Sequence, residues 1–219
     1  MSEQRDRILE CACELYLAHG LDGFSMRKLA KEVGVTAPAI YRHYDGREAV
    51  LADVLREAHR TFSRYLYEAL GAPTPLERFM AAGEQYLRFV MEHPRWHGMM
   101  HTAPEHLGME ALPEDIEALQ QATSQFWLDR VRESMDAGIL RRVDPEEASV
   151  TLWAHAHGMV HLFQQGCLPV EPEDFRDFFA ASSRRIMMGL GTQEFARQLQ
   201  DLDTETPSTE PEYTGVEAG

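Results

Sequence analysis

The stretch GFSMRKLAKEVGVTAPAIYRHYDGREAVL, residues 23–51, has apolar residues at helical spacing on both sides of a glycine. Ser25 stands where it can cap a helix over residues 26–33, and Gly34 follows that helix at a turn. Apolar residues return at helical spacing over 37–44, which predicts a second short helix. Two short helices joined by a glycine-containing turn have the layout of a helix-turn-helix, in which the second helix enters the major groove of DNA.

The predicted second helix, 37–44, has one face that suits burial and one that suits contact with DNA. Thr36 is placed to cap this helix, and Ile40 and Tyr44 fall on the side that would pack against the preceding helices. The front of the other side, residues 37–39, is small enough for the backbone to approach base edges. Aromatic and basic side chains flank this front and can reach phosphates.

The charge of the chain is unevenly distributed. The 219 residues have a formal net charge of −15, yet residues 1–64 contain ten Lys or Arg and ten Asp or Glu. The excess of negative charge therefore belongs to the later part of the chain, while basic residues outnumber acidic ones within 26–47. Because salt screens charges beyond about 8 Å, a local basic face can still meet a polyanion.

Composition excludes several classes of protein. We expect neither a secretory leader nor a membrane span, because the chain has no N-terminal apolar region and no apolar run near ~18 residues. The three cysteines form an odd number, which does not suit a disulfide framework and fits a reducing compartment. We therefore expect a cytoplasmic protein.

Helical spacing extends along almost the whole chain, which predicts an all-α fold of about nine helices. The helices expected outside the opening stretch are 3–19, ended by Gly20; 46–70, capped by Asp45; one capped by Thr74, with Pro75 in its first turn, that ends near His93–Pro94; a short one over 96–101; and later ones that start near Pro113, near Pro145 after the capping residue Asp144, and near Pro172. We expect a domain over 4–64, a second over 72–200, and a disordered acidic tail over 203–219.

The opening stretch resembles the N-terminal DNA-binding domain of the tetracycline repressor (TetR) family. That family has a Ser/Thr-capped helix, a Gly-Val turn, and a recognition helix ending in Tyr-x-His-Phe before a Lys-Glu start to the next helix. The matching residues here are Ser25, Gly34–Val35, Tyr41–Arg42–His43–Tyr44 and Arg47–Glu48. Tyr44 stands in place of the usual Phe and Arg47 in place of the usual Lys.

The resemblance implies a homodimeric transcriptional regulator, a repressor, that binds a near-palindromic DNA operator and is released by a small effector. A long helix would join the three-helix DNA-binding domain to a helical domain that binds the effector and dimerises. The residues expected to contact phosphates or bases are Ser25, Arg27, Lys28, Thr36, Ala37, Pro38, Ala39, Tyr41, Arg42, His43 and Arg47.

The later part of the chain resembles a C-terminal subgroup of the family marked by Trp…His-Gly, here Trp153, His157 and Gly158. Aromatic, methionine and histidine residues suit a site for an apolar or aromatic effector. The residues expected to line it are Met91, Trp96, Met100, His101, Trp127, Trp153, His157 and His161.

Three alternatives stay open. His97/His101 and His157/His161 are spaced i, i+4, as in helical zinc sites, which suggests a metal-responsive regulator, although no carboxylate completes a familiar zinc motif. A constitutive DNA-binding protein without an effector is the second. The third is an enzyme, which we do not expect because no nucleophile elbow, phosphate loop or cofactor fingerprint occurs. No metal or cofactor is therefore assigned.

Overall fold

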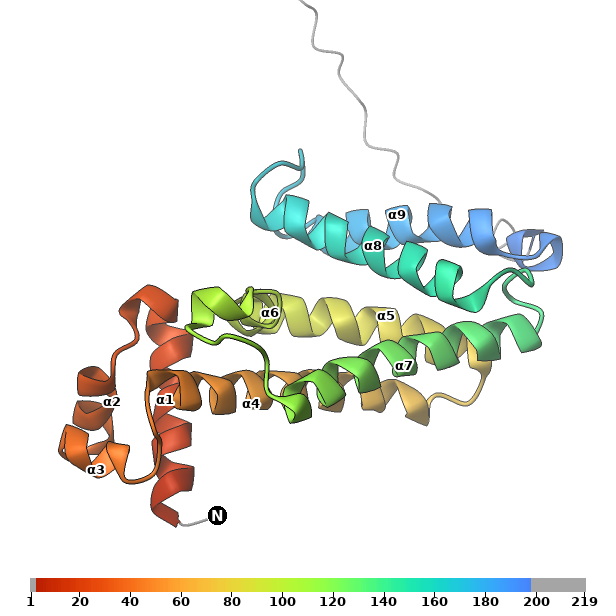
Figure 1. Ribbon diagram of the computed structural model, residues 1–219. Coiled ribbons are helices and arrows are strands. Elements are labelled where there is room, and N and C mark those ends of the chain that lie inside the picture. The colour runs from red at the N-terminus through yellow and green to blue at the C-terminus, as the bar shows by residue number, and fades with distance from the viewer. Residues whose placement is uncertain (1–2, 198–219) are drawn as a thin grey trace, which may run out of the picture. The chain divides into compact units, whose positions relative to one another are not determined.

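The computed structural model describes residues 3–197, and these residues form helices joined by short turns (Figure 1). The α-helices are α1 (Glu3–Gly23), α2 (Met26–Val33), α3 (Ala37–Tyr41), α4 (Arg47–Glu68), α5 (Pro75–Glu92), α6 (Pro94–Met100), α7 (Glu114–Asp136), α8 (Pro145–Gln164) and α9 (Phe175–Leu190), with 3-10 turns at Ala69–Gly71 and Pro104–Leu107. Within the described residues, β structure is limited to one isolated bridge between Leu140 and Gly191. The all-α prediction is confirmed. The acidic tail predicted over 203–219 lies outside the described residues.

Side-chain caps fix the starts of several helices. The Ser25 hydroxyl accepts a hydrogen bond from the backbone N–H of Lys28 at 3.3 Å, as expected for the first residue before α2. Thr74 and Glu77 form a reciprocal capping box at the start of α5. The Asp144 carboxylate accepts from two backbone N–H groups at the start of α8. These caps lie where the sequence places them.

Two predicted caps are wrong. Thr36 occupies the position before α3, but its hydroxyl makes no capping hydrogen bond. Gly46, and not Asp45, precedes α4, and this helix start has no side-chain cap at all.

One helix end differs from the prediction. α3 ends at Tyr41 rather than at residue 44, because the N–H groups of His43 and Tyr44 both bond to the carbonyl of Ile40 and tighten the chain into a turn. The regular part of α1 ends at Gly20 as predicted, because Gly20 has the non-helical backbone angles φ 65° and ψ −168°, and a short second helical segment follows this kink up to Gly23.

The structure divides into two compact units, up to Arg130 and from Val131 onward. In the first unit, α1 packs against α2 and α4, α2 packs against α3, and α4 also packs against α5 and α6 (Figure 1). The fully buried side chains that hold this helix group together include Ile8, Ala12, Leu29, Ile40, Val50, Leu51 and Val54. Burying each of the larger ones contributes about 1.5–3 kcal/mol.

In the second unit, α8 and α9 lie side by side (Figure 1). The rings of Phe163 and Phe175 stack with their centroids 3.8 Å apart, and His155 stacks on Phe179. The hydroxyl of Ser183 lies 3.4 Å from Nε2 of His155. Aromatic stacking thus fixes how the two helices of this unit pair. None of the helices described is both long and apolar enough to cross a membrane.

Candidate nucleic-acid interface

A glycine turn joins α2 to α3. Gly34 has φ 78°, in the left-handed region that glycine adopts without strain, and its N–H donates to the carbonyl of Lys31 at 3.2 Å. The N–H of Val35 donates to the carbonyl of Ala30 at 2.9 Å. These two bonds close the end of α2 and turn the chain into α3.

The two faces of α3 have opposite environments. Ile40 is 0% exposed and Tyr44, just past the helix, is 3% exposed, so this side anchors α3 to the helices behind it. On the other side, Pro38 and Arg42 are exposed and Tyr41 is 52% exposed. This is the orientation that a groove-reading helix requires, with a fixed inner face and a free outer face.

The hydroxyl of Tyr44 is held by a carboxylate on α4. It donates to Oδ2 of Asp53 at 2.9 Å, and Nη2 of Arg5 lies 3.0 Å from the same oxygen. The Arg5 guanidinium also lies 4.7 Å from the centroid of the Tyr44 ring. Burial first, and the Asp53 charge next, raise the pKa of Tyr44, so its hydroxyl stays protonated and remains a donor.

Asp53 belongs to a chain of ion pairs that continues to α7. Arg56 pairs with Asp53 and also forms a two-pronged contact with Asp115, with Nε 2.5 Å from Oδ2 and Nη2 3.0 Å from Oδ1. The hydrogen bond from Arg56 holds the pKa of Asp115 below its ordinary value. The residue that ends the α3 turn is thus connected to the first turn of α7 through charged side chains.

The basic residues predicted to contact DNA fall into two groups. Nζ of Lys28 donates to the Gly23 carbonyl at 2.8 Å, and Nη2 of Arg47 donates to the Leu21 carbonyl at 3.2 Å. Both therefore satisfy carbonyls at the end of α1 as well as presenting charge. Arg27 and Arg42 are exposed and form no ion pair with any residue in 3–197. They are available for contact with DNA.

The other predicted contact residues lie at or next to α3 and the start of α2. Ala37, Ala39, His43 and Ser25 are half-buried, and Thr36 is exposed. Ser25 is already used as a helix cap. All the predicted contact residues belong to the first unit.

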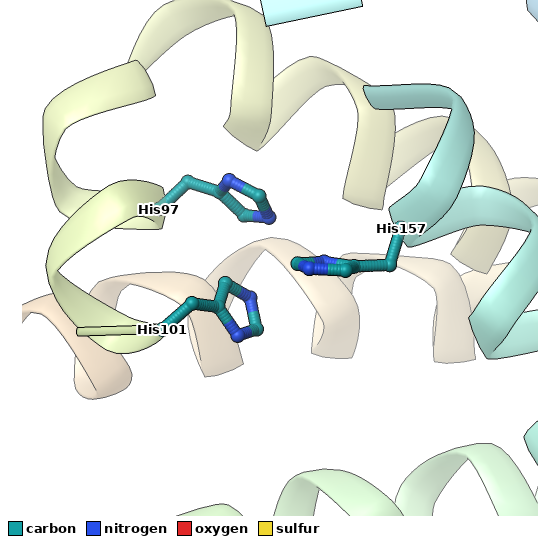
Figure 2. Close-up of side chains that lie close together, drawn as sticks. All are labelled: His97, His101 and His157. Atoms are coloured by element: carbon teal, nitrogen blue, oxygen red, sulfur yellow. The ribbon is translucent and has the colours of Figure 1, made fainter. Parts of the chain in front are cut away.

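Five of the predicted effector residues also belong to this first unit. Trp96 is buried and stacks on His93 with ring centroids 5.2 Å apart, whereas Met91 is 42% exposed. Met100 and Trp127 are half-buried, and His101 is exposed. The ring centroids of His101 and His97 lie 4.6 Å apart, and both side chains extend to the same side of α6 (Figure 2).

The remaining three predicted effector residues lie on α8. Trp153 is 50% exposed and stacks on His157 with centroids 5.4 Å apart, and His157 stacks on His161 at 6.5 Å. Burial first, and then the charge of His161, lower the pKa of His157. These three rings form one row along α8.

Two polar residues whose buried atoms lack partners among the described residues, His59 and Gln85, were not predicted from the sequence, and a third, Trp96, was predicted only for its ring. His59 on α4 is 3% exposed, and neither of its ring nitrogens has a hydrogen-bond partner among the described residues. Oε1 of Gln85 on α5 and Nε1 of Trp96 on α6 are also buried, and neither has a hydrogen-bond partner in the part of the chain that the structure describes. His59 sits at an apolar position of the α4 pattern, which was the one signal that could have identified it.

The chain matches two family sequence profiles. Residues 8–54 match the profile of bacterial regulatory proteins of the tetR family, and residues 79–186 match that of the tetracyclin repressor-like C-terminal domain. The first match contains the whole α2–turn–α3 segment described above. Assignment to the Trp…His-Gly subgroup stays a prediction.

Known proteins agree with these profiles. The chain is 25% identical to the HTH-type transcriptional repressor KstR2 of Mycolicibacterium smegmatis over 147 residues, which is 64% of this chain and 69% of that protein. A protein of unknown function from Rhodococcus sp. RHA1 has a similar structure, with a TM-score of 0.75 at 23% identity over 88% of this chain and 97% of that one. The structure of AibR in complex with isovaleryl coenzyme A and operator DNA has a TM-score of 0.62 at 20% identity over 86% of this chain and 98% of that one.

At these identities the solved structures show a shared fold, and together with the two profiles they lead to one conclusion. The chain belongs to the tetracycline repressor (TetR) family of DNA-binding transcriptional regulators.

Proposed function

We propose that the chain is a ligand-responsive repressor that binds a near-palindromic operator as a homodimer and is released by a small effector. The observation that carries this proposal is the contrast between the two faces of α3. Ile40 is fully buried while Pro38 and Arg42 are exposed. The relation to a repressor and to a fold solved with both acyl-CoA and operator DNA supports the same function.

Within this proposal the contact residues have different roles. Arg42 reads base edges, because a guanidinium can bond both acceptors of a guanine and no partner within 3–197 holds this side chain. Ala37, Pro38 and Ala39 allow close approach to the groove, where they contact thymine methyl groups. The remaining predicted residues, Ser25, Arg27, Lys28, Thr36, Tyr41, His43 and Arg47, position the protein on the phosphates.

The proposed dimer is formed by the second unit. Large apolar side chains on α8 and α9 are exposed, namely Val150 at 60%, Trp153 at 50%, Leu162 at 43% and Phe178 at 36%. A second copy of the same surface would remove these side chains from water. Two-fold symmetry then requires operator half-sites about 34 Å apart, or a multiple of that spacing.

The effector acts by preferring one conformation of the dimer. A ligand shifts the equilibrium only by its difference in affinity for the DNA-binding and the released states. We propose an apolar or aromatic effector bound by the C-terminal domain, with no enzymatic step and in the cytoplasm, where the operator is. The effector residues predicted from the sequence stay a prediction within each unit, namely Met91, Trp96, Met100, His101 and Trp127 in the first and Trp153, His157 and His161 in the second.

Selection of bound fragments from random duplex DNA tests the proposal. We expect enrichment of one near-palindromic sequence with half-sites separated by about one helical turn or a multiple. The Arg42→Ala variant should relax the preference at one position in each half-site. Arg60→Ala, which removes an exposed arginine of α4, is the control and should leave the selected sequence unchanged.

Two results of this selection would contradict the proposal. Equal binding to specific and random duplexes would favour a constitutive, non-specific DNA-binding protein. Specific binding that no compound of a metabolite library weakens would remove the effector from the proposal and keep the operator.

A metal-responsive regulator is the second candidate, because the ring centroids of His97 and His101 lie 4.6 Å apart on one side of α6 (Figure 2). Two imidazoles at this spacing can share a transition metal ion. Titration with Co²⁺ should then produce a d–d absorption band that His101→Ala abolishes. His106→Ala, an exposed histidine just beyond α6, is the control. A spectrum that stays flat, or that both variants change equally, would rule out this candidate.

A further inference from the structure

The chain between α6 and α7 passes over the first half of α4 (Figure 1). It touches α4 in two places, through residues 108 and 115, and we call residues 108–115 the strap. Leu107 and Ile116, which flank the strap, are 1% and 0% exposed. Both ends of the strap are therefore anchored by buried apolar side chains.

The first contact is a close approach between Gly108 and Glu48. Gly108 follows the 3-10 turn Pro104–Leu107 and has φ 81°, in the left-handed region. A methyl group at Gly108 would lie 3.1 Å from Cγ and 3.2 Å from Oε1 of Glu48. The other carboxylate oxygen of Glu48 faces Gly46, where an added methyl group would lie 2.8 Å from Oε2. The Glu48 side chain thus lies between the strap and the residue that precedes α4.

The second contact is the ion pair of Arg56 with Asp115. Nη2 of Arg56 lies 3.0 Å from Oδ1 of Asp115, and Nε lies 2.5 Å from Oδ2. The Arg56 side chain is 17% exposed, so this pair is partly shielded from water. Two-pronged charged contacts of this kind fix geometry as well as adding energy. Arg56 follows Glu48 by two helical turns, so the strap contacts one side of α4 at both ends of a short segment.

This segment of α4 carries the links to the recognition helix and to the proposed phosphate contacts. Asp53 accepts the hydrogen bond from the Tyr44 hydroxyl, just past α3, at 2.9 Å. Arg47, directly before Glu48, donates to the Leu21 carbonyl at 3.2 Å. A shift of α4 at either strap contact would therefore move a proposed phosphate contact and the carboxylate that holds the end of α3.

We propose that Gly108 and Asp115 are positioning residues for operator binding, because the strap holds the first half of α4 where Arg47 and α3 need it to be. Neither residue has to touch DNA for this role. A groove-reading helix tolerates little displacement, because hydrogen bonds to base edges weaken steeply as their distance and angle change. The inference rests on the proposed function, since it takes an operator for granted.

Substitution of Gly108 tests the first contact. Gly108→Ala places a methyl group against Glu48, which then has to shift by a few tenths of an ångström. Anisotropy titrations should show about tenfold weaker binding to the duplex enriched from random fragments, and a loss of at most about twofold on random duplex.

Gly138→Ala is the matched control for this variant. Gly138 also has a left-handed φ, 73°, but apart from its neighbours in sequence no atom of the described residues lies within 4 Å of the added methyl group. Both variants should lower the Tm, because both place a side chain in the left-handed region. Only Gly108→Ala should weaken operator binding.

A double variant separates positioning from stability. In a Glu48→Ala chain the methyl group of Gly108→Ala meets no carboxylate, so its tenfold effect on the operator should shrink to about twofold or less. The loss of Tm should remain, because the left-handed φ at residue 108 is the same in both chains.

Substitution of Asp115 tests the second contact without changing the backbone. Asp115→Ala should weaken operator binding about fivefold, and Asp115→Glu, which keeps the negative charge, should recover most of that loss. Asp136→Ala is the control, because its partner Arg142 and Asp136 itself are exposed, and it should bind the operator like the wild type.

The results separate the inference from the function on which it rests. Operator binding within about twofold of its control, for either folded variant, would overturn the inference. So would an equal effect of Gly108→Ala with and without Glu48, or an Asp115→Glu variant that binds as weakly as Asp115→Ala. If Gly108→Ala does not fold, the Asp115 variants decide. A wild-type chain that binds all duplexes equally would contradict the proposed function itself, and the inference would fall with it.

Discussion

Replacement of Asp53 should destabilise the chain more than its position near the surface suggests. Asp53→Ala leaves the Tyr44 hydroxyl, on a side chain that is 3% exposed, without its acceptor, which costs about 1–3 kcal/mol. The variant also breaks the pairs with Arg5 and Arg56, whose side chains are 40% and 17% exposed, and each adds up to about 1 kcal/mol. We expect a total near 3 kcal/mol.

A double-mutant cycle isolates the hydrogen bond. Tyr44→Phe alone should cost about 1 kcal/mol, because Asp53 keeps both arginines. Once Tyr44 is Phe, removal of Asp53 no longer strands a hydroxyl, so the double variant should be about 1 kcal/mol more stable than the sum of the two losses predicts.

Urea denaturation followed by circular dichroism, at one protein concentration, measures these free energies of unfolding. Asp136→Ala is the matched control, because its pair with Arg142 has both side chains more than two-thirds exposed and should matter by less than about 0.5 kcal/mol. Losses for Asp53→Ala and Tyr44→Phe that add within about 0.3 kcal/mol would refute the role of the hydrogen bond. So would an Asp53→Ala variant as stable as the control.

Three further predictions concern DNA binding, pH and assembly. Arg47→Ala should weaken binding to all duplexes equally and reduce the salt dependence by about one charge, and the lost bond to the Leu21 carbonyl should lower the free energy of unfolding by about 1 kcal/mol. Arg42→Ala should instead cost about 1–3 kcal/mol of binding free energy on the operator alone. Anisotropy titrations of operator and random duplexes at several salt concentrations measure both effects, and an equal loss on both duplexes for Arg42→Ala would contradict its role in base contact. The pKa of His59 is lowered to about 4 in the folded chain and is near 6.5 in the unfolded chain, so between these values the unfolded chain takes up a proton that the folded chain does not. The free energy of unfolding should therefore fall by at most about 3 kcal/mol as the pH drops from 6.5 to 4. The urea midpoint should fall less steeply with pH for His59→Leu, and the same pH dependence for both proteins would contradict the assignment. Trp153→Asp should shift the chain from dimer to monomer in analytical ultracentrifugation because it places a charge in the proposed apolar seam, while an unchanged mass would exclude this residue from the interface.

Local signals in the sequence were enough to predict the helices. Ser25, Thr74 and Asp144 cap helices where the sequence indicates, because a capping bond involves only residues two or three positions apart. Ile40 and Tyr44 are buried as their spacing predicts. The error at Asp45 has the same origin, since a good capping residue one position early looks the same in sequence as one in the correct place.

Contacts between residues far apart in the chain could not be predicted from the sequence. Nothing in the spacing of these residues indicates that α4 connects the α3 turn to α7, because Tyr44 lies 9 positions from Asp53 and Arg56 lies 59 positions from Asp115. His59 was not predicted as a buried polar residue for a different reason. Its position looks apolar, and only the folded chain shows that its ring is buried without a hydrogen-bond partner among residues 3–197. Periodicity predicts which side of a helix is buried, but it does not predict what each buried atom meets.

The carbonyls at the end of α1 have a consequence for the energetics of operator binding. A lysine or arginine that moves freely in water loses up to about 2 kcal/mol of rotamer entropy when a phosphate immobilises it. Lys28 and Arg47 are already held by Gly23 and Leu21, so folding has met part of that cost before DNA arrives. In the proposed complex with DNA, these two cations are therefore preorganised for phosphate contact, whereas the proposed base contact of Arg42 starts from a side chain with more rotamer freedom.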